Sequence, residues 1–260
     1  MDKDVVRMGI EVDWDRYAEQ YDAVTMAGSN PTYVALVRKV AESFRGFMVR
    51  PDALIADIGG GTGNFSIPIA QMYPHSRVIL VDSSERMLKQ AREKVSRYGL
   101  MNLDIICADI LSEIPDLAEK YSRPFSHVMM IHTLYTTGGL KSAAPLKLLK
   151  DINKHLDDDT NSRFLISDTN RISKIWKWIP YCLFHAFKTY GFKEALSFLK
   201  RNEQARKMNR DIITKQKEGH CLLCSLEEFV ELVKAAGFSK IYEKSDKYYL
   251  GIDNFVIAGK

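Results

Sequence analysis

The sequence predicts an α/β protein with a doubly wound, mostly parallel sheet, and three observations support this class. Short apolar runs alternate with stretches of helical length along the first 170 residues. The runs are largely continuous, which is typical of strands that are covered on both faces. Strand and helix follow each other repeatedly, which predicts parallel pairing through crossover helices. With 46% hydrophobic and 27% charged residues, the composition is that of a globular protein and excludes disorder.

Five strands are expected before residue 170, each a short apolar run. They are Ala53–Ile58, Arg77–Val81, Leu103–Cys107, His127–Ile131 and Phe164–Ser167. The helices expected between them are Asn64–Met72, Ser84–Tyr98 and Lys141–His155. Ligands of such sheets bind outside the carboxyl ends of the strands, where the strand order reverses. The residues that directly follow each run are therefore the first candidates for a functional site.

The alternation breaks after residue 170. Residues 171–217 carry 12 Lys and Arg residues against three acidic ones, a formal charge of +9 in a chain that totals +4. The same segment holds eight aromatic residues and many helix formers, so we expect a helical insertion there. A helix then starts at Ser225, where Glu228 completes a capping box, and stops at Gly237. Two final strands are expected around Lys240–Glu243 and Asn254–Ala258.

Cysteine usage and the start of the chain bear on location. Four cysteines are too few for a disulfide scaffold, and Met1 is followed by charged residues rather than by a signal segment. The apolar run Trp178–Phe184 contains a proline and is far shorter than the about 18 residues that span a bilayer. We therefore expect a cytoplasmic protein that is not integral to a membrane.

The strongest functional signal is Asp57-Ile58-Gly59-Gly60-Gly61-Thr62-Gly63, which follows a predicted strand and opens a helix. Glycines let the backbone turn sharply and approach a ligand, and the helix start offers unpaired N–H groups. Asp82 ends the next predicted strand, where a carboxylate accepts hydrogen bonds from ribose hydroxyls. Together these features predict a nucleoside site.

The glycine spacing bears on which nucleoside cofactor binds. The dinucleotide fingerprint is G-x-G-x-x-G, but its third glycine position, counted from Gly59, is Asn64. The glycines present fit G-x-G-x-G instead, which disfavours pyrophosphate binding. An NAD(P)-dependent oxidoreductase stays open as an alternative of a different class.

This loop, its position about 50 residues into the chain, and the acid-ended second strand resemble class I S-adenosylmethionine-dependent methyltransferases of the small-molecule type. The resemblance covers roughly Trp14–Asn170, and Leu250–Lys260 matches the family's closing antiparallel strand. It implies a Rossmann-like methyltransferase fold and S-adenosyl-L-methionine as cofactor. Three parts are then expected: a helical cover at 1–50, a cofactor-binding domain at 51–170 and 218–260, and an acceptor lid at 171–217.

The resemblance also implies roles for individual residues. The cofactor-binding positions it implies are Tyr17, Tyr21, Asp57, Gly59, Gly61, Gly63, Asp82, Ser83, Met87, Asp109 and Ile110. Asp82 is expected to hold the ribose, and Asp109 to reach the adenine amino group. Tyr17 and Tyr21 match an aromatic helix that covers the cofactor, although their spacing of four also fits simple packing on one helical face.

A sulfonium methyl is already activated, so the enzyme must align a nucleophile and, where needed, remove a proton; this requires no metal. His132, Asp168 and Tyr135 lie after predicted strands and are the candidate catalytic residues. His132 equally fits a structural, hydrogen-bonded role, and Asp168 fits a turn cap. The segment at His132 lacks the N/D-P-P-Y/F motif of amino-methylating nucleic-acid enzymes, which argues against a nucleobase amine as the acceptor.

The basic aromatic insertion leaves three interpretations open. It is a cap packed on the core, a lid over a hydrophobic or aromatic acceptor, or a peripheral membrane contact, because basic amphipathic helices favour anionic surfaces. For the lid, the candidate acceptor-binding residues are Trp178, Tyr181, Phe184 and His185. A total charge of +4 without a further motif makes nucleic acid an unexpected partner. Cys221 and Cys224 lack a second pair, so no metal site is expected.

The sequence thus predicts an enzyme that methylates O, N or C of a small hydrophobic or aromatic acceptor. A protein that binds S-adenosylmethionine without methylating is a further alternative. The acceptor and the oligomeric state are left open.

Overall fold

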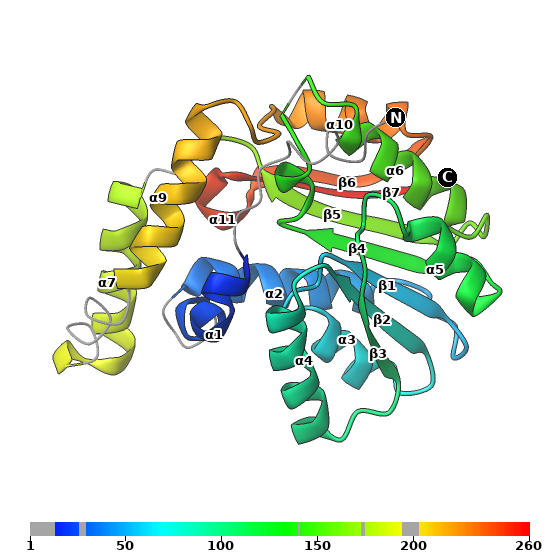
Figure 1. Ribbon diagram of the computed structural model, residues 1–260, viewed down its shortest axis with the longest axis horizontal. Helices are drawn as coiled ribbons and strands as arrows, with labels where there is room; N and C mark the ends of the chain where they lie inside the picture. Colours follow the sequence, from blue (N-terminus) through cyan, green and yellow to red (C-terminus); the bar gives the residue numbers. More distant parts are fainter. Residues whose placement is uncertain (1–13, 26–29, 140, 173–174, 194–202) are drawn as a thin grey trace.

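A sheet of seven strands, counted within the described residues, forms the middle layer of the protein (Figure 1). The structure is a computed structural model that describes residues 14–25, 30–139, 141–172, 175–193 and 203–260. The strands are β1 (Leu54–Ile58), β2 (Arg77–Asp82), β3 (Leu103–Cys107), β4 (His127–Ile131), β5 (Arg163–Thr169), β6 (Lys240–Lys247) and β7 (Asp253–Gly259). Their order is β3-β2-β1-β4-β5-β7-β6, in which the first five are parallel and β7 runs antiparallel between β5 and β6. The predicted fold class is confirmed.

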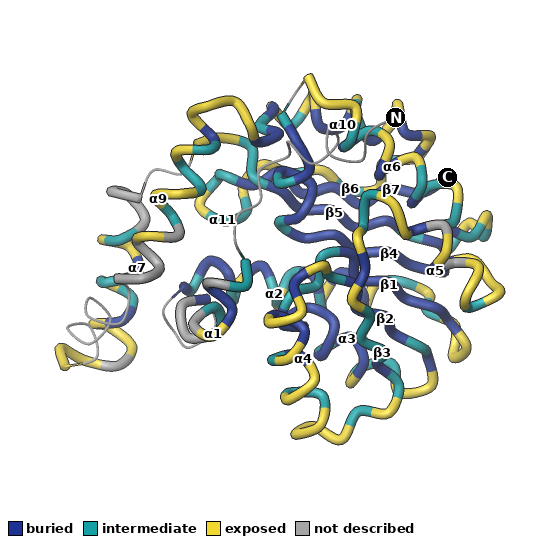
Figure 2. The backbone as a smooth tube through the Cα atoms, in the orientation of Figure 1, coloured by how far each residue is buried: buried dark blue, intermediate teal, exposed yellow. Residues whose placement is uncertain are grey.

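Helices cover both faces of this sheet (Figure 1). One face is covered by α2 (Pro31–Arg45), α3 (Ser66–Met72) and α4 (Glu85–Tyr98). The other face is covered by α5 (Ile114–Tyr121), α6 (Ala144–His155) and α10 (Leu226–Ala235). In Figure 2 the buried chain is concentrated in the central strands, while the outer sides of the helices are exposed.

The two-sided cover explains the continuous apolar runs. Along β1, Leu54 and Ala56 pack into the core beneath α5 and α6, whereas Ile55 packs into the core beneath α2 and α3. Every residue of β1 is buried, so its sequence does not alternate between apolar and polar residues. The edge strand β6 instead alternates between half-buried and exposed residues.

Local signals place the helix ends. The Ser84 side chain accepts a hydrogen bond from the Met87 amide at the start of α4, and Gly99 ends that helix in the left-handed region. Ser225 and Glu228 form the predicted capping box of α10. Helix α5 was not predicted, because it spans only eight residues and no capping side chain marks its start.

Within the described residues, four further helices lie beyond the carboxyl ends of the parallel strands (Figure 1). They are α1 (Trp14–Thr25), α7 (Ile175–Tyr190), α9 (Glu203–Lys217) and α11 (Tyr248–Gly251). Helix α1 contacts both α4 and α9, so it lies between the sheet domain and the insertion. The described part of the insertion is mostly helical, as expected, and consists largely of α7 and α9. None of the helices in the described part of the chain combines the length and apolar character that a bilayer span requires.

Candidate active site

A cleft opens at the carboxyl ends of β1, β2 and β4, and it encloses about 680 Å³ of space, part of it open to solvent. Its lining residues come from α1, α2, the carboxyl ends of β2 and β4, the loops after β1 to β4, and the start of α4. They are Trp14, Tyr21, Tyr33, Gly59, Gly60, Gly61, Phe65, Asp82, Ser83, Met87, Ile110, Ile131, His132, Thr133 and Thr136. The cleft therefore lies at the neighbouring strands β1 and β4, where the strand order reverses, which is the place that the doubly wound topology predicts for a ligand.

The glycine loop forms the floor of the cleft. Gly59, Gly61 and Gly63 have φ values of 74°, 54° and 79°, which residues with a Cβ rarely adopt. A Cβ on Gly59 would lie 2.3 Å from the Thr133 side chain, whereas a Cβ on Gly61 would find its nearest neighbour at 3.9 Å. The loop at Gly61 is thus open toward the cleft, and a ligand can approach its backbone closely.

Asp82 closes one side of this loop. Its Oδ2 accepts the Gly61 amide at 2.9 Å, and its Oδ1 accepts the Ser84 amide at 2.8 Å. Each carboxylate oxygen has two lone pairs, so both oxygens retain capacity for ligand hydroxyls. Burial raises the pKa of Asp82 above its ordinary value, although these backbone donors oppose the shift.

Four predicted cofactor residues, Tyr17, Asp57, Gly63 and Asp109, lie outside the cleft lining. Asp57 is 1% exposed and accepts a hydrogen bond from the Ser66 hydroxyl beneath the loop. Burial raises the pKa of Asp57 to about 7. Asp109 instead accepts the Leu111 amide at 2.9 Å and holds its own turn. Direct cofactor contacts of Asp57 and Asp109 stay predictions, while their neighbours Gly59 and Ile110 do line the cleft.

Aromatic side chains cover the cleft. Tyr21 makes edge contacts with Trp14 and Tyr33, each at 6.3 Å between ring centroids, and Tyr33 packs on Phe65 at 5.5 Å. Tyr17 does not line the cleft, because its hydroxyl donates to Asp211 of α9. Trp14 is the cleft-lining aromatic of α1 that the sequence prediction did not include among the site residues.

Helix α1 is fixed to the glycine loop by polar contacts. Asp22 accepts the Thr62 hydroxyl at 2.7 Å and the Asn64 amide at 2.9 Å. Lys94 of α4 donates to the second oxygen of Asp22 at 2.7 Å. Asn64, which excluded the dinucleotide fingerprint, therefore joins the cover helix to the loop.

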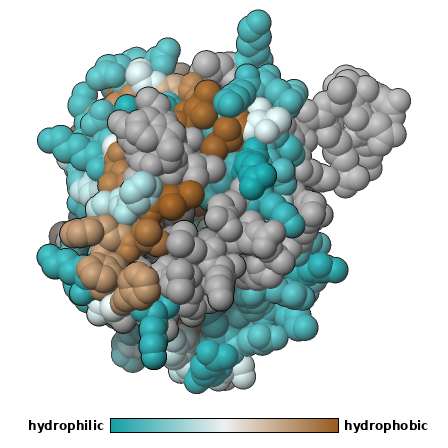
Figure 3. Space-filling view, turned by 90° about the vertical axis from the view of Figure 1, so that its left-hand side faces the viewer, coloured by the Kyte–Doolittle hydropathy of each residue, from teal (hydrophilic) through white to brown (hydrophobic). Residues whose placement is uncertain are grey.

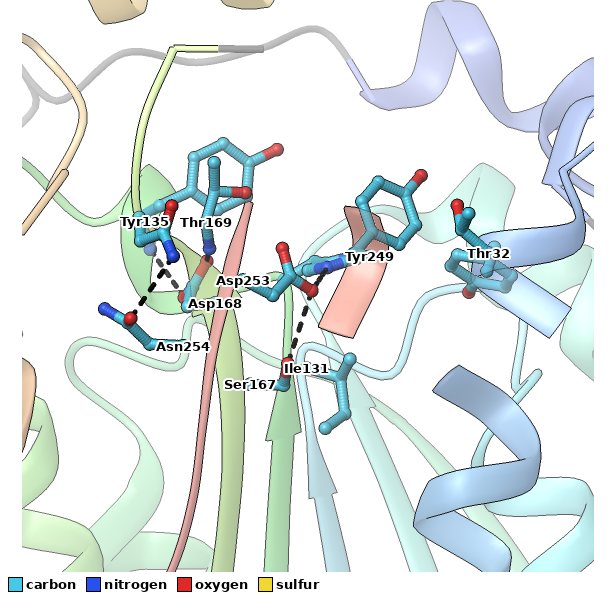
Figure 4. A network of polar contacts seen from close by, with 12 residues as sticks. Thr32, Ile131, Tyr135, Ser167, Asp168, Thr169, Tyr249, Asp253 and Asn254 are labelled. Carbon is cyan, nitrogen blue, oxygen red and sulfur yellow. Dashed lines mark hydrogen bonds and ion pairs between the residues drawn. The ribbon is translucent and has the colours of Figure 1, made fainter. Parts of the chain in front are cut away.

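His132 follows β4 and has a left-handed backbone with φ of 53°. Its amide donates to the Ser167 carbonyl at 2.8 Å, and its Nε2 lies 2.5 Å from Oδ2 of Asp253, the first residue of β7. The Ser167 hydroxyl also donates to this oxygen, at 3.3 Å. Figure 4 shows Asp253 held above the end of β5 by these contacts. Burial disfavours the imidazolium, but the adjacent Asp253 carboxylate outweighs it and raises the pKa of His132.

The turn before β7 supports His132 from the other side. The Tyr249 ring meets the His132 ring edge-on, with 5.0 Å between centroids. Tyr249 and Leu250 have φ values of 52° and 60°, a pair of strained non-glycine positions. The Tyr249 hydroxyl accepts a hydrogen bond from the Asn30 side chain at 2.6 Å, which ties this turn to the start of α2.

Asp168 and Tyr135 lie behind His132 and do not line the cleft. Asp168 accepts the amides of Tyr135 and Thr169, each at 2.9 Å, and so joins the end of β5 to the 3₁₀ turn η1 (Leu134–Thr136). Burial raises the pKa of Asp168 to about 7, although the His132 charge opposes the shift. These contacts fit the alternative of a turn cap, and catalytic roles for Asp168 and Tyr135 stay predictions.

The predicted acceptor residues lie on α7. Tyr181 and Phe184 are 43% and 66% exposed and are not part of the cleft lining. His185 is half-buried, and its Nδ1 is buried without a hydrogen bond to a described residue. The side chain of Trp178 lies outside the described residues. Acceptor binding by these four residues stays a prediction.

Sequence reasoning missed Asp253, Tyr249 and Asn30. Asp253 lies 121 positions from His132, and their contact depends on β7 entering the sheet beside β5. A usable signal was present: an acidic residue opens a buried closing strand. Among the described residues no cluster of three His, Cys, Asp or Glu side chains is arranged to hold a metal.

Comparisons with known proteins point to methyltransferases. A family model described as a methyltransferase domain matches residues 55–159. The chain is 26% identical over 216 residues to carboxy-S-adenosyl-L-methionine synthase from Nautilia profundicola, which covers 82% of this chain and 80% of that protein. It is also 31% identical over 104 residues to ribosomal RNA small subunit methyltransferase G from Xylella fastidiosa. This match covers 48% of that methyltransferase.

Two solved structures share the fold. An S-adenosylmethionine-dependent methyltransferase from Aquifex aeolicus has a TM-score of 0.57 at 16% identity, covering 94% of this chain and 97% of that one. An O-methyltransferase-like protein from Nostoc punctiforme has a TM-score of 0.59 at 16% identity, covering 95% of this chain and 60% of that one.

The fold, the glycine loop and the methyltransferase domain matched over residues 55–159 together support a class I S-adenosylmethionine-dependent methyltransferase. S-adenosyl-L-methionine is accordingly its cofactor, and the nicotinamide alternative is set aside. The residues present fit this cofactor, because the open backbone at Gly61 lies beside the spare acceptor capacity of Asp82.

Proposed function

We propose that the protein methylates an oxygen or nitrogen of a small organic acceptor, with His132 as the general base. The supporting observation is the His132–Asp253 pair. His132 lines the cleft beside the glycine loop, and its Nε2 lies 2.5 Å from a carboxylate that is fully buried. An acceptor hydroxyl or amine needs proton removal as it is methylated, and histidine is the side chain most often used for this step.

The pair sets the tautomer of His132. An ionised carboxylate only accepts hydrogen bonds, so neutral His132 carries its proton on Nε2 and keeps a lone pair on Nδ1. Nδ1 then takes the acceptor proton, and Asp253 stabilises the imidazolium that forms. Because the carboxylate raises the pKa of His132, the base is free only above that raised value. The rate should therefore rise as the pH rises through it.

Other residues bind and shield the reactants. The bound cofactor supplies an activated methyl group. The glycine loop and Asp82 hold it, and the rings of Trp14, Tyr21 and Phe65 limit the access of water. Once the acceptor is aligned in line with the methyl group, no further residue of the chain has to take part in the transfer.

The aromatic cover favours a hydrophobic or aromatic acceptor. Rings from α1, α2 and the glycine loop line the cleft, and they offer apolar faces for a flat molecule. We propose that residues 171–217 cap the acceptor side, with the inward face of α7 toward the acceptor. Cys182 and Ala186 are buried on that face, whereas Tyr181 and Phe184 are exposed.

Screening for S-adenosylhomocysteine formation tests this function. The panel holds small phenols, hydroxylated rings, amines and total ribosomal RNA, because one relative is named for an RNA substrate. With an active acceptor, His132→Ala should lower turnover about 100-fold or more while cofactor affinity stays unchanged. His75→Ala, which removes an exposed histidine at the opposite edge, is the matched control. Equal turnover of the His132 variant and the parent refutes the general base.

One observation favours a second candidate. The relative that matches over 82% of this chain is named a carboxy-S-adenosyl-L-methionine synthase, so modification of the cofactor itself is the alternative. Mass spectrometry of the same reactions separates the two: methyl transfer yields S-adenosylhomocysteine with a methylated acceptor, whereas the alternative yields a carboxylated cofactor. We place both activities in the cytoplasm, in keeping with four unbridged cysteines.

A further inference from the structure

The outer face of α7 carries aromatic side chains that no described element covers. Tyr181, Phe184 and Phe187 are 43%, 66% and 53% exposed, and Phe192 just beyond the helix is 69% exposed. On the opposite side of the same helix, Cys182 and Ala186 are at most 4% exposed. We call the four exposed rings the aromatic face of α7. Figure 3, which looks at this side of the molecule, shows hydrophobic side chains gathered among hydrophilic ones.

Exposing these apolar rings to water is unfavourable, so we expect a functional reason for it. The spacing of three between Tyr181, Phe184 and Phe187 places them on one side of the helix. A contiguous exposed apolar face of this kind marks an interaction surface rather than the scattered exposure found on most proteins. The helix also keeps Pro180 in its interior, and Pro180 is exposed on the same side.

Along the chain, the charge around the aromatic face is mostly positive. Residues 171–193 contain five Lys and Arg residues and no Asp or Glu, and Glu194 follows them. Of these, Arg171, Lys188 and Lys193 are described, and all three are exposed. The rest of the chain, outside 171–217, sums to −5, so the net positive charge of the chain comes from this segment.

We propose that the aromatic face of α7 docks onto a membrane surface that carries anionic lipids. Aromatic rings flanked by lysine and arginine are the pattern of helices that lie in the plane of the lipid headgroups. The cations are attracted by the negative surface potential of such a membrane. The rings enter the boundary between headgroups and acyl chains. Helix α7 lies beyond the carboxyl ends of the strands, so docking brings the catalytic end of the molecule toward the lipid (Figure 1).

Two other occupants fit the charge pattern less well. A second copy of this chain would place two surfaces of the same positive sign together, which opposes association. Single-stranded RNA uses aromatic rings along a positively charged groove that tracks its backbone. The aromatic face of α7 is the convex side of one helix, a shape that suits a flat surface.

Vesicle sedimentation tests the proposal without any methyl acceptor, so its outcome is independent of the proposed function. The probes are vesicles of pure phosphatidylcholine and vesicles with 30 mol% phosphatidylserine (about one lipid in three), at low and at high salt. We expect binding to the anionic vesicles only, and weaker binding at high salt. Phe184→Ser with Phe187→Ser should lower the partition coefficient about tenfold or more. Lys188→Glu with Lys193→Glu should lower it similarly and reduce the salt dependence.

A matched control removes exposed apolar residues elsewhere. Met48 and Met101 are 73% and 88% exposed and precede β1 and β3 at the opposite end of the sheet. Met48→Ser with Met101→Ser should bind vesicles like the parent. Unchanged melting temperatures of all variants establish that each is folded.

Several results would overturn the proposal. They are no binding to anionic vesicles, equal binding by the phenylalanine variant, or equal loss in the methionine control. Sedimentation velocity and an RNA gel-shift complete the test. A dimer that the phenylalanine variant abolishes would assign the aromatic face of α7 to self-association, and RNA binding without lipid binding would assign it to RNA.

Discussion

Replacing Asp253 by Asn probes the pair on which the proposed mechanism depends. The substitution keeps the size of the side chain and removes its charge beside Nε2 of His132. The two groups lie 2.5 Å apart, and Asp253 is fully buried, so solvent screens their interaction little. A hydrogen bond to a charged group contributes about 1.5–3 kcal/mol, and 1.36 kcal/mol corresponds to one pKa unit. The pKa of His132 should therefore fall by about one to two pH units.

The assay is an NMR titration of histidine ring signals, with His132 assigned by loss of its signal in His132→Ala. It needs no acceptor and reports the pKa directly. In turnover, the rising limb of the pH profile should move to lower pH by the same amount, and maximal kcat should fall about 10- to 100-fold because the tautomer is no longer fixed.

The control is Ser167→Ala, which removes the second contact to Asp253 at 3.3 Å and keeps the carboxylate charge. It should shift the pKa of His132 much less. If Asp253→Asn leaves the pKa of His132 where it is in the parent, the carboxylate does not act on this histidine and the dyad is wrong.

Three further changes test the cofactor site and the core. Asp82→Ala should weaken S-adenosylmethionine binding by about 1–3 kcal/mol in calorimetric titration while the melting temperature is kept, since it removes an acceptor at the cleft wall; equal affinity would exclude Asp82 as the ribose ligand. Gly59→Ala should abolish detectable cofactor binding and destabilise the fold by about 1–3 kcal/mol, because its Cβ would lie 2.3 Å from the Thr133 side chain. Gly61→Ala is the control: it has the same positive φ without that clash, and so separates backbone strain from the steric clash. His127 is buried, and burial with the nearby positive charge of Arg163 lowers its pKa to about 4. The stability that neutral His127 contributes is complete above about pH 6.5 and is lost as the pH falls toward 4, by up to about 3 kcal/mol. In urea unfolding, the free energy of unfolding of His127→Phe should therefore fall less over this pH range than that of the parent. The same pH dependence in both proteins would contradict this.

Much of the sheet domain was predictable from local patterns. The runs that became β1 to β5 are apolar on both faces because helices cover both faces of the sheet. The capping box at Ser225 and the glycine loop were visible because their side chains and missing Cβ atoms act on neighbouring residues. Helix α5 and the 3₁₀ turn η1 were missed, since both are short and their stability comes from packing.

The candidate site divides along the same line. Gly59, Gly61, Asp82, Ser83, Met87 and Ile110 line the cleft as predicted positions of one chain segment. Asp57 and Asp109 belong to the same segment, but their carboxylates do not line the cleft. They accept hydrogen bonds beneath or beside the segment instead, because their nearest donors are local. Sequence spacing does not reveal which way such a carboxylate turns.

The sequence by itself determined the fold class, the cofactor loop and the basic, aromatic character of the insertion. These follow from periodicity, glycine position and charge, which are properties of neighbouring residues. Only the tertiary structure decided that Asp253 meets His132 and that Tyr17 meets Asp211. It also decided that the rings of α7 face outward. Each of these depends on contacts between segments far apart in the chain, and the burial that gives such contacts their strength exists only once the sheet and its covering helices have assembled.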